Sequence, residues 1–178
     1  MMIDKARQLA TLLHKDQLRK YTGEPYINHP IEVARLVSTV PHTDEMICAA
    51  ILHDTSEDCG ITIKELAHIF GNEVAMLVEM LTDPSTKEDG NRRERKSIDL
   101  MHTSKASPQA KTLKLADLID NTKSIVEHDK SFARIYLTEK ESLLEVLTEG
   151  DPFLYGMAKQ SLIWGQSQLI QHRLSRRI

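Results

Sequence analysis

The sequence predicts an all-α protein, and three observations support this. Apolar residues recur with the helical period of 3.6 along nearly the whole chain, and no segment shows the alternation of a β-strand. Only 7 of the 178 residues are Gly and 6 are Pro, and aromatic residues make up 4%, a composition that disfavours a β-sandwich. A chain of this length can bury enough surface for its own core. We therefore expect residues 1–178 to form a single domain, a bundle of about nine helices.

In the first part of the chain, turn and capping residues separate five expected helices. The polar stretch 15–28 ends the first apolar stripe, and Pro41 stops the second helix. Gly60 closes the third helix. Thr62 opens the fourth helix, with Glu65 completing a capping box. The expected helices in this part cover residues 3–13, 30–40, 44–60, 62–70 and 74–81.

The second part of the chain contains four further expected helices. Ser107 followed by Pro108 is a strong start signal, because proline suits the first position of a helix. Residues 83–92 are polar, and we expect a surface loop there. The apolar stripe within residues 162–174 has the spacing of a core face or of a homodimer seam, and we favour the core. The expected helices cover residues 93–102, 107–126, 131–147 and 152–174.

Composition excludes several classes of protein. The net charge is −3 and the pI is near 6.2, so the chain is not basic enough to suggest a nucleic-acid polymer or a membrane surface as partner. The two cysteines, Cys48 and Cys59, are too few for a disulfide framework. The N-terminus lacks the apolar segment of a signal peptide, and the longest apolar run, residues 48–52, is far shorter than a membrane span. We therefore expect a cytoplasmic protein.

Four titratable residues gather at the end of the third expected helix. This buried helix, rich in Ala and Ile, ends in His53, Asp54, Glu57 and Asp58. Unpaired charges are costly inside a core, so the cluster requires an explanation. His53 and Glu57 are four residues apart, as are Asp54 and Asp58, and each pair shares one face if the helix continues. One pair can then bind a metal while the other reaches towards a substrate.

Two further residues complete a candidate metal site. His29 precedes Pro30 at the start of the second helix, and Asp117 lies in an otherwise apolar stretch. A carboxylate among leucines requires a partner, and the alternatives are a metal ion or a salt bridge to Lys114 or Lys123. The complete set offers two imidazoles and two carboxylates, from His29, His53, Asp54 and Asp117. Mixed nitrogen and oxygen ligation suits Mn, Fe, Co or Zn better than Ca, and Mn²⁺ suits a phosphate substrate.

Three segments of the chain resemble the HD-domain metal-dependent phosphohydrolases. They are residues 19–30 (RKYTGEPYINHP), residues 53–58 (HDTSED) and residues 114–121 (KLADLIDN). The more specific similarity is to the (p)ppGpp hydrolase domain of the RelA/SpoT proteins and to the stand-alone small alarmone hydrolases of the Mesh type. The resemblance covers residues 1–127 and implies an all-helical fold with one metal, usually Mn²⁺. It implies hydrolysis of the 3′-pyrophosphate of (p)ppGpp to GDP or GTP plus pyrophosphate.

The resemblance also implies roles for individual residues. The metal ligands are His29, His53, Asp54 and Asp117. Glu57 and Asp58 match the acidic pair that acts on the attacking water. Arg19 matches the residue that packs on the guanine, and Lys20 would neutralise phosphate. Asn121 and Ser124 follow Asp117 on the same helix face, where they could hydrogen-bond the ribose or phosphate of the nucleotide.

The sequence also departs from the family pattern. The first segment has one additional residue at Tyr21-Thr22. Asp120 stands where an aromatic residue or His is usual, and we expect its carboxylate to repel phosphate or to face solvent. The basic cluster at residues 92–96 is partly balanced by neighbouring acids, and we expect it to be a solvated face rather than a nucleotide-attracting one. No motif is recognised after Glu127.

Two other functions remain open from the sequence. The same fold and metal site suit a phosphatase or phosphodiesterase acting on another nucleotide, such as a 5′-nucleotidase or an NADPH phosphatase. A non-catalytic alarmone-binding protein is the third alternative, although the ligand set would be expected to decay in such a protein. In all three cases the partner is a small-molecule nucleotide.

Overall fold

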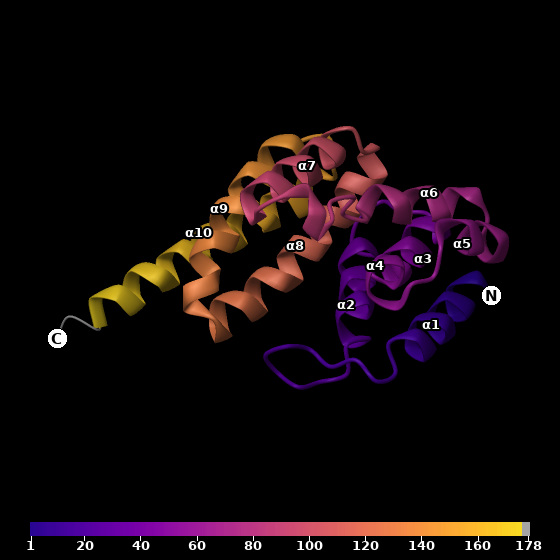
Figure 1. The fold of residues 1–178 in the computed structure, drawn as a ribbon, viewed down its shortest axis with the longest axis horizontal. Coiled ribbons are helices and arrows are strands. Elements are labelled where there is room, and N and C mark those ends of the chain that lie inside the picture. The colour runs from indigo at the N-terminus through magenta and orange to yellow at the C-terminus, as the bar shows by residue number, and fades with distance from the viewer. Residues whose placement is uncertain (176–178) are drawn as a thin grey trace.

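The fold is entirely helical over residues 1–175, which are the residues that the computed structural model describes (Figure 1). This confirms the predicted fold class. No helix in this range is both long and apolar enough to cross a membrane. The helices are α1 (Met2–Leu13), α2 (Asn28–Val37), α3 (Asp44–Leu52), α4 (Thr55–Cys59), α5 (Ile63–Phe70), α6 (Asn72–Leu81), the 3₁₀ helix η1 (Lys87–Asp89), α7 (Arg92–Ser104), α8 (Pro108–His128), α9 (Lys130–Val146) and α10 (Pro152–Ser175).

The helix expected over residues 44–60 is in fact two helices, α3 and α4. Backbone carbonyls near the break accept hydrogen bonds from side chains. His53 Nδ1 donates to the carbonyl of Ala50 at 2.8 Å, and Thr55 Oγ1 donates to that of Leu52 at 2.6 Å. Such bonds compete with the regular helical ladder. The chain therefore turns at residues 53–54 before α4 begins. As predicted, α4 ends at Gly60, which has a left-handed conformation with φ +74°.

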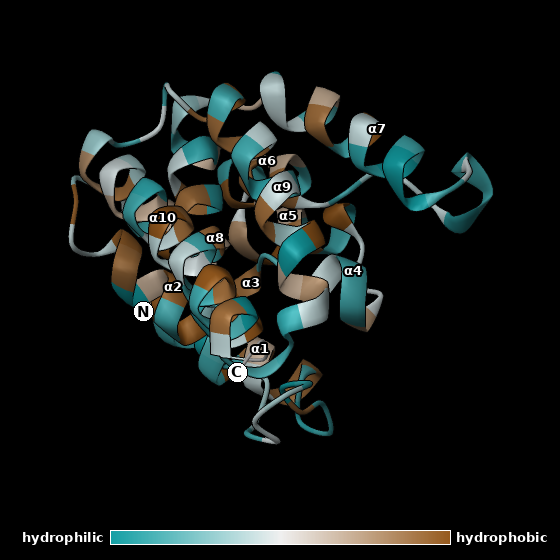
Figure 2. Cartoon of the chain, turned by 90° about the vertical axis from the view of Figure 1, so that its left-hand side faces the viewer, coloured by the Kyte–Doolittle hydropathy of each residue, from teal (hydrophilic) through white to brown (hydrophobic). Residues whose placement is uncertain are grey.

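Other boundaries follow the capping residues closely. The capping box of Thr62 and Glu65 is present, and the Ser107 side chain accepts from the N–H of Ala110 at the start of α8. Asn91 forms a capping box that was not predicted, and α7 begins at Arg92. Figure 2 shows α7 and the polar segment before it standing out from the rest of the molecule, with mainly hydrophilic residues.

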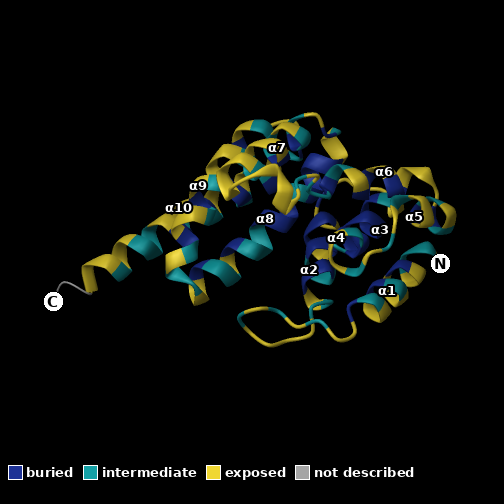
Figure 3. Ribbon diagram, in the orientation of Figure 1, coloured by how far each residue is buried: buried dark blue, intermediate teal, exposed yellow. Residues whose placement is uncertain are grey.

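Helices α3 and α8 form the centre of the molecule. All seven residues of α3 from Met46 to Leu52 are buried, and α3 packs against α1, α2, α6 and α8 (Figure 3). Helix α8 packs in addition against α2, α6, α9 and α10. Burying large apolar side chains supplies the main driving force for this arrangement. Because α2, α3 and α8 meet, residues far apart in the sequence come to one place.

The C-terminal helix only partly matches the expected core stripe. Leu162 is buried, but Ile163, Ile170 and Leu174 are 56%, 62% and 57% exposed. The end of α10 extends beyond the helices it packs on, α8 and α9, which explains the exposure (Figure 1). The assignment of the whole stripe to the core was therefore wrong.

A lysine lies fully buried where α8, α9 and α10 meet. Lys140 Nζ donates to Thr122 Oγ1 at 2.6 Å, to Ser161 Oγ at 2.5 Å and to the carbonyl of Leu118 at 3.4 Å. Burial lowers the pKa of Lys140 to about 7, although the charge of Asp117 opposes the shift. The amine therefore loses its proton in the folded protein at a pH where the unfolded chain keeps it.

We expect Lys140 to make stability rise with pH above neutrality. Between pH 7 and the ordinary lysine pKa of 10.5, the unfolded state binds one more proton than the folded state. The free energy of unfolding of the wild type should therefore increase relative to Lys140→Met by up to about 1.4 kcal/mol per pH unit. Urea unfolding at several pH values above 7 measures this. Lys64→Met, at an exposed lysine of α5, is the control, and its free energy of unfolding should depend on pH as that of the wild type does. A difference between the wild type and Lys140→Met that stays constant with pH would contradict the prediction.

Candidate metal centre

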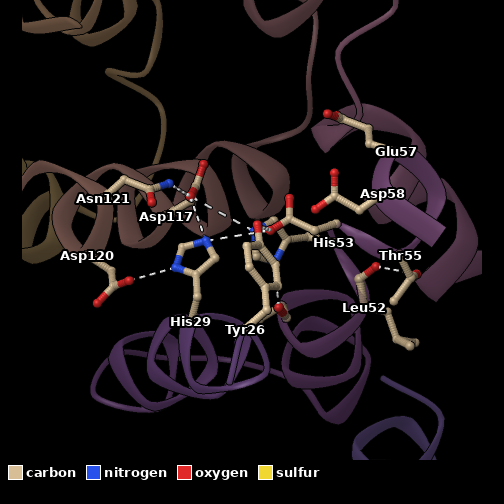
Figure 4. Close-up of polar contacts among 12 residues, drawn as sticks. Tyr26, His29, Leu52, His53, Thr55, Glu57, Asp58, Asp117, Asp120 and Asn121 are labelled. Carbon is tan, nitrogen blue, oxygen red and sulfur yellow. Dashed lines mark hydrogen bonds and ion pairs between the residues drawn. The ribbon is translucent and has the colours of Figure 1, made fainter. Parts of the chain in front are cut away.

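Helix α2, the turn between α3 and α4, and helix α8 bring four predicted ligands together. His29 Nε2 lies 3.3 Å from Asp117 Oδ1 and 3.6 Å from Asp54 Oδ2. His53 Nε2 lies 3.1 Å from Asp54 Oδ2 and 3.9 Å from Asp117 Oδ1. Ligand atoms of His29, His53 and Asp54 all lie within 4.8 Å of one another. Figure 4 shows the two imidazoles and Asp117 from α8 converging on one point.

Both imidazoles present the Nε2 atom to this point. His53 Nδ1 is used by the carbonyl of Ala50, and His29 Nδ1 donates to Asp120 Oδ2 at 2.6 Å. His53 Nε2 is buried, and no group within residues 1–175 meets it with hydrogen-bond geometry. A buried polar atom without a partner is costly. Two imidazole nitrogens and two carboxylates are a donor set for a divalent transition metal, so the residues present fit such an ion.

The carboxylates and imidazoles of the centre stabilise one another's charged forms. Burial alone would lower the pKa of His29, but Asp117, Asp120 and Asp54 outweigh it and raise this pKa to about 9. Burial would raise the pKa of Asp54 and that of Asp117, but positive neighbours hold both well below the usual range. The centre therefore attracts cations, whether protons or a metal ion.

Neighbouring side chains hold the two carboxylates in place. The hydroxyl of Tyr26 donates to Asp54 Oδ2 at 2.7 Å, and Asn121 Nδ2 donates to Asp117 Oδ1 at 2.6 Å. The salt bridge that was the alternative explanation of Asp117 also exists, because Lys114 Nζ lies 3.4 Å from Asp117 Oδ2. It engages the other oxygen and leaves Oδ1 facing the imidazoles. The salt bridge is therefore present, and the geometry leaves Oδ1 available to a metal ion.

The acidic pair lies on α4 beside the centre (Figure 4). The N–H of Asp58 donates to the carbonyl of Asp54 at 2.9 Å, so the four-residue spacing still places these two on one side despite the break in the helix. Glu57 Oε1 accepts from the N–H of Asp83 at 2.6 Å. Partial desolvation of the carboxyl by the surrounding protein raises the pKa of Glu57 to about 7, although the Asp83 N–H opposes the shift. A carboxyl that titrates near neutrality is suited to proton transfer.

A cavity of about 1030 Å³ opens from Asp117 and Asn121 and runs between α7, α8 and α9. Its polar walls include Arg92, Arg93 and Lys96; Arg92 and Arg93 are exposed, as expected for a solvated face, and Lys96 is half-buried. The cations gather here because α7 packs against α9 and turns its first residues towards the space between them. The cavity can accommodate an anionic ligand of nucleotide size.

The residues expected to bind a nucleotide divide into two groups. Arg19 lies beside Asn121, with Nη1 3.4 Å from Asn121 Oδ1, and it lines a smaller cavity of about 350 Å³ together with Ser124. Lys20 Nζ lies 4.9 Å from the ring centre of Tyr21 and 5.8 Å from that of Phe132, which lines the larger cavity together with Asn121. Arg19 and Ser124 thus line the smaller cavity, whereas Asn121 and the phenyl ring beneath Lys20 line the larger one.

Two residues that contact the predicted ligands were not identified from the sequence. Asp120 was expected to face solvent or repel phosphate, but its Oδ2 accepts from His29 and also from Arg19, at 3.0 Å. Tyr26 lies in the turn before α2 and donates to Asp54, and its place within the segment 19–30 that resembles the family was the available signal for it. For Asp120 the signal was the departure from the family pattern itself.

Comparisons with known proteins agree with this geometry. A sequence profile described as HD domain matches residues 6–143. Among curated proteins, the chain is 44% identical over 115 residues to the guanosine-3′,5′-bis(diphosphate) 3′-pyrophosphohydrolase MESH1 of Danio rerio, a match that covers 63% of this chain and 62% of that protein, less than two thirds of its length. It is 39% identical over 124 residues to MESH1 of Homo sapiens, covering 68% of each chain.

A solved structure has the same fold. It is described as a metazoan ortholog of SpoT that hydrolyses ppGpp, and its TM-score is 0.83 at 25% sequence identity. The superposition covers 92% of this chain and 94% of that one. The similarity therefore extends beyond residues 6–143, which the sequence profile matches, and into α10.

We expect Mn²⁺ to stabilise the metal-stripped protein through this centre. A ligand at 100 times its dissociation constant adds about 2.7 kcal/mol, which for this chain length corresponds to about 5–10 °C in Tm. His53→Ala removes the buried Nε2 and should lose most of this gain. His68→Ala, at an exposed histidine of α5, should keep it. Thermal unfolding with and without Mn²⁺ tests this, and an equal gain in His53→Ala would exclude His53 as a ligand.

Proposed function

The chain belongs to the HD domain family, and on this premise we propose that it is a metal-dependent hydrolase of the alarmone (p)ppGpp. It removes the 3′-pyrophosphate and leaves GDP or GTP. The observation that carries the proposal is the convergence of two imidazoles and two carboxylates beside an acid–base residue, at the mouth of a basic cavity. The activities of the MESH1 relatives and of the structural neighbour, as their names state them, support the choice of substrate.

The protein's own residues supply most of the chemistry. His29, His53, Asp54 and Asp117 would hold one divalent metal. When bound, this ion would acidify a water molecule and offset negative charge on a phosphate oxygen. Glu57 and Asp58 orient that water and accept its proton. The water oxygen joins the phosphorus, the bond from phosphorus to the ribose 3′-oxygen breaks, and this oxygen leaves with the proton that the acidic pair accepted from the water.

The nucleotide is held by residues around the centre. Asn121 and Ser124 hydrogen-bond the ribose or phosphate, and Arg19 packs against the guanine. The ammonium group of Lys20 neutralises negative charge on the phosphates of the nucleotide. The cations of the large cavity attract the highly charged substrate, although Asp83, Asp99 and Glu139 in the same walls offset part of their charge.

Further parts of the proposal rest on the sequence. We assign Mn²⁺ as the ion, since its mixed-ligand preference suits a phosphate substrate. Residues 1–178 act as one HD-type domain in the cytoplasm, because two cysteines are too few for the disulfide framework of a small secreted domain. The partner is the small nucleotide and not a nucleic-acid polymer or a membrane. A homodimer stays an alternative, for which the exposed apolar side chains of α10 are the candidate surface.

The decisive experiment compares three substrates. The metal-stripped protein is reloaded with Mn²⁺ and incubated separately with ppGpp, GMP and NADPH, and the products are separated by anion exchange. We expect GDP and pyrophosphate from ppGpp only, with loss of the reaction on addition of a chelator. Phosphate released from GMP or NADPH, with ppGpp intact, would transfer the function to another nucleotide phosphatase. Tight binding of ppGpp without turnover would indicate an alarmone-binding protein.

We expect Glu57→Gln to lower kcat by about 10²- to 10⁴-fold, because an amide cannot accept a proton. The amide oxygen can still accept from the N–H of Asp83, so the fold and the Mn²⁺ affinity should be unchanged. Glu88→Gln makes the same chemical change at an exposed residue of η1 and should retain full activity. Titration calorimetry of Mn²⁺ together with steady-state rates measures both effects. A wild-type rate in Glu57→Gln would remove this residue from the mechanism.

A further inference from the structure

A single carboxylate oxygen links the metal centre to the residue proposed to bind the nucleotide base. Asp120 Oδ2 accepts from His29 Nδ1 at 2.6 Å and from Arg19 Nη2 at 3.0 Å. These partners come from the loop before α2 and from the start of α2, and they are 101 and 91 residues from Asp120 in the sequence. Their side chains are mostly buried, with 1% of His29, 14% of Arg19 and 21% of Asp120 exposed.

The contact determines which nitrogen of His29 faces the centre. An ionised carboxylate only accepts hydrogen bonds, so Nδ1 of His29 carries a proton. The ring is thereby held with Nε2 towards Asp54 and Asp117, as Figure 4 shows for the dashed contact from Asp120 to His29. A carboxylate behind a histidine ligand fixes the ring and increases its basicity as a metal ligand.

The same oxygen also determines where Arg19 lies. The ion pair holds the guanidinium beside Asn121, whose Oδ1 is 3.4 Å from Nη1. A side chain that is already ordered loses less conformational entropy when a ligand binds to it. The contact to Asp120 also compensates the positive charge of Arg19. A guanidinium whose charge is compensated is better suited to stack on a neutral nucleotide base than to bind a phosphate.

We propose that Asp120 is a positioning residue that orients His29 for the metal and holds Arg19 for the nucleotide base. The role of Arg19 rests on the proposed function, whereas the role towards His29 rests on the geometry of the centre. Asp120 thus makes metal affinity and nucleotide affinity depend on one side chain. In this sequence it occupies a position where the resemblance leads us to expect an aromatic residue or His.

Titration of Mn²⁺ into the metal-stripped protein tests the first part. Asp120→Ala should weaken Mn²⁺ binding by about 10- to 100-fold, the usual effect of removing a partner behind a metal ligand. Asp120→Asn keeps an oxygen that can accept from His29 and should recover part of the affinity. Asp16→Ala removes the same group at a side chain that is 89% exposed and should bind Mn²⁺ like the wild type. Wild-type affinity in Asp120→Ala would overturn the proposal. If that variant fails to fold, wild-type affinity in Asp120→Asn would count against it.

A double-mutant cycle with Arg19 tests the second part. At saturating Mn²⁺, Asp120→Asn should raise the KM for ppGpp more than it lowers kcat. The same substitution made in an Arg19→Gln background should leave KM unchanged, because the residue that it positions is already lost. Equal effects in both backgrounds would overturn the link to Arg19. If the protein does not cleave ppGpp, the proposed function fails, and the Mn²⁺ titrations still decide the role of Asp120 towards His29.

Discussion

Oxygen and nitrogen acceptors facing one another inside the molecule are the constraint on which the rest of the structure depends. Two imidazole Nε2 atoms and the carboxylates of Asp54 and Asp117 meet within 3.1–3.9 Å. Neutral imidazole nitrogens and ionised carboxylate oxygens repel one another unless a proton or a metal ion lies among them. The raised pKa of His29 and the lowered pKa values of both carboxylates show the same preference for a positive charge among these atoms. The surrounding helices hold the four side chains together against this repulsion.

The rigidity that this requires comes from how the ligands are carried. Asp117 lies in the middle of α8, the helix that contacts most of the others, and His53 directly follows the buried helix α3. His29 lies in the first turn of α2, which packs on both. A close-packed interior resists displacement of any one helix. The hydrogen bonds from Tyr26 and Asn121 then fix the orientation of the carboxylates, which packing alone does not determine.

Sequence reasoning succeeded where the signal was local. Periodicity and caps predicted the all-helical fold and the starts of α5 and α8. The charged residues at the ends of or within apolar stretches, together with the resemblance to the HD-domain hydrolases, predicted His29, His53, Asp54 and Asp117, which converge. It failed where side chains distant in the sequence decide the outcome. Asp120 acts on residues 91 and 101 positions away. The break after α3 was missed because it depends on side-chain bonds from His53 and Thr55 to carbonyls, which periodicity does not report.

The cations of the large cavity are held by acids before any ligand arrives. Arg92 forms two hydrogen bonds to Glu139, at 2.7 and 2.8 Å, and Lys96 contacts Asp83 and Asp99 at 2.5 and 2.9 Å. These pairs fix long side chains that would otherwise lose much conformational entropy when an anion binds. They also limit the net positive charge of the walls. An anion that binds to Arg92 or Lys96 must therefore replace some of the contacts that these side chains make with the acids. Asp83 takes part in both regions, because its backbone N–H donates to Glu57 while its carboxylate holds Lys96. The segment that leads from α6 towards α7 thus ties the cations of the cavity to the acid–base residue of the proposed reaction.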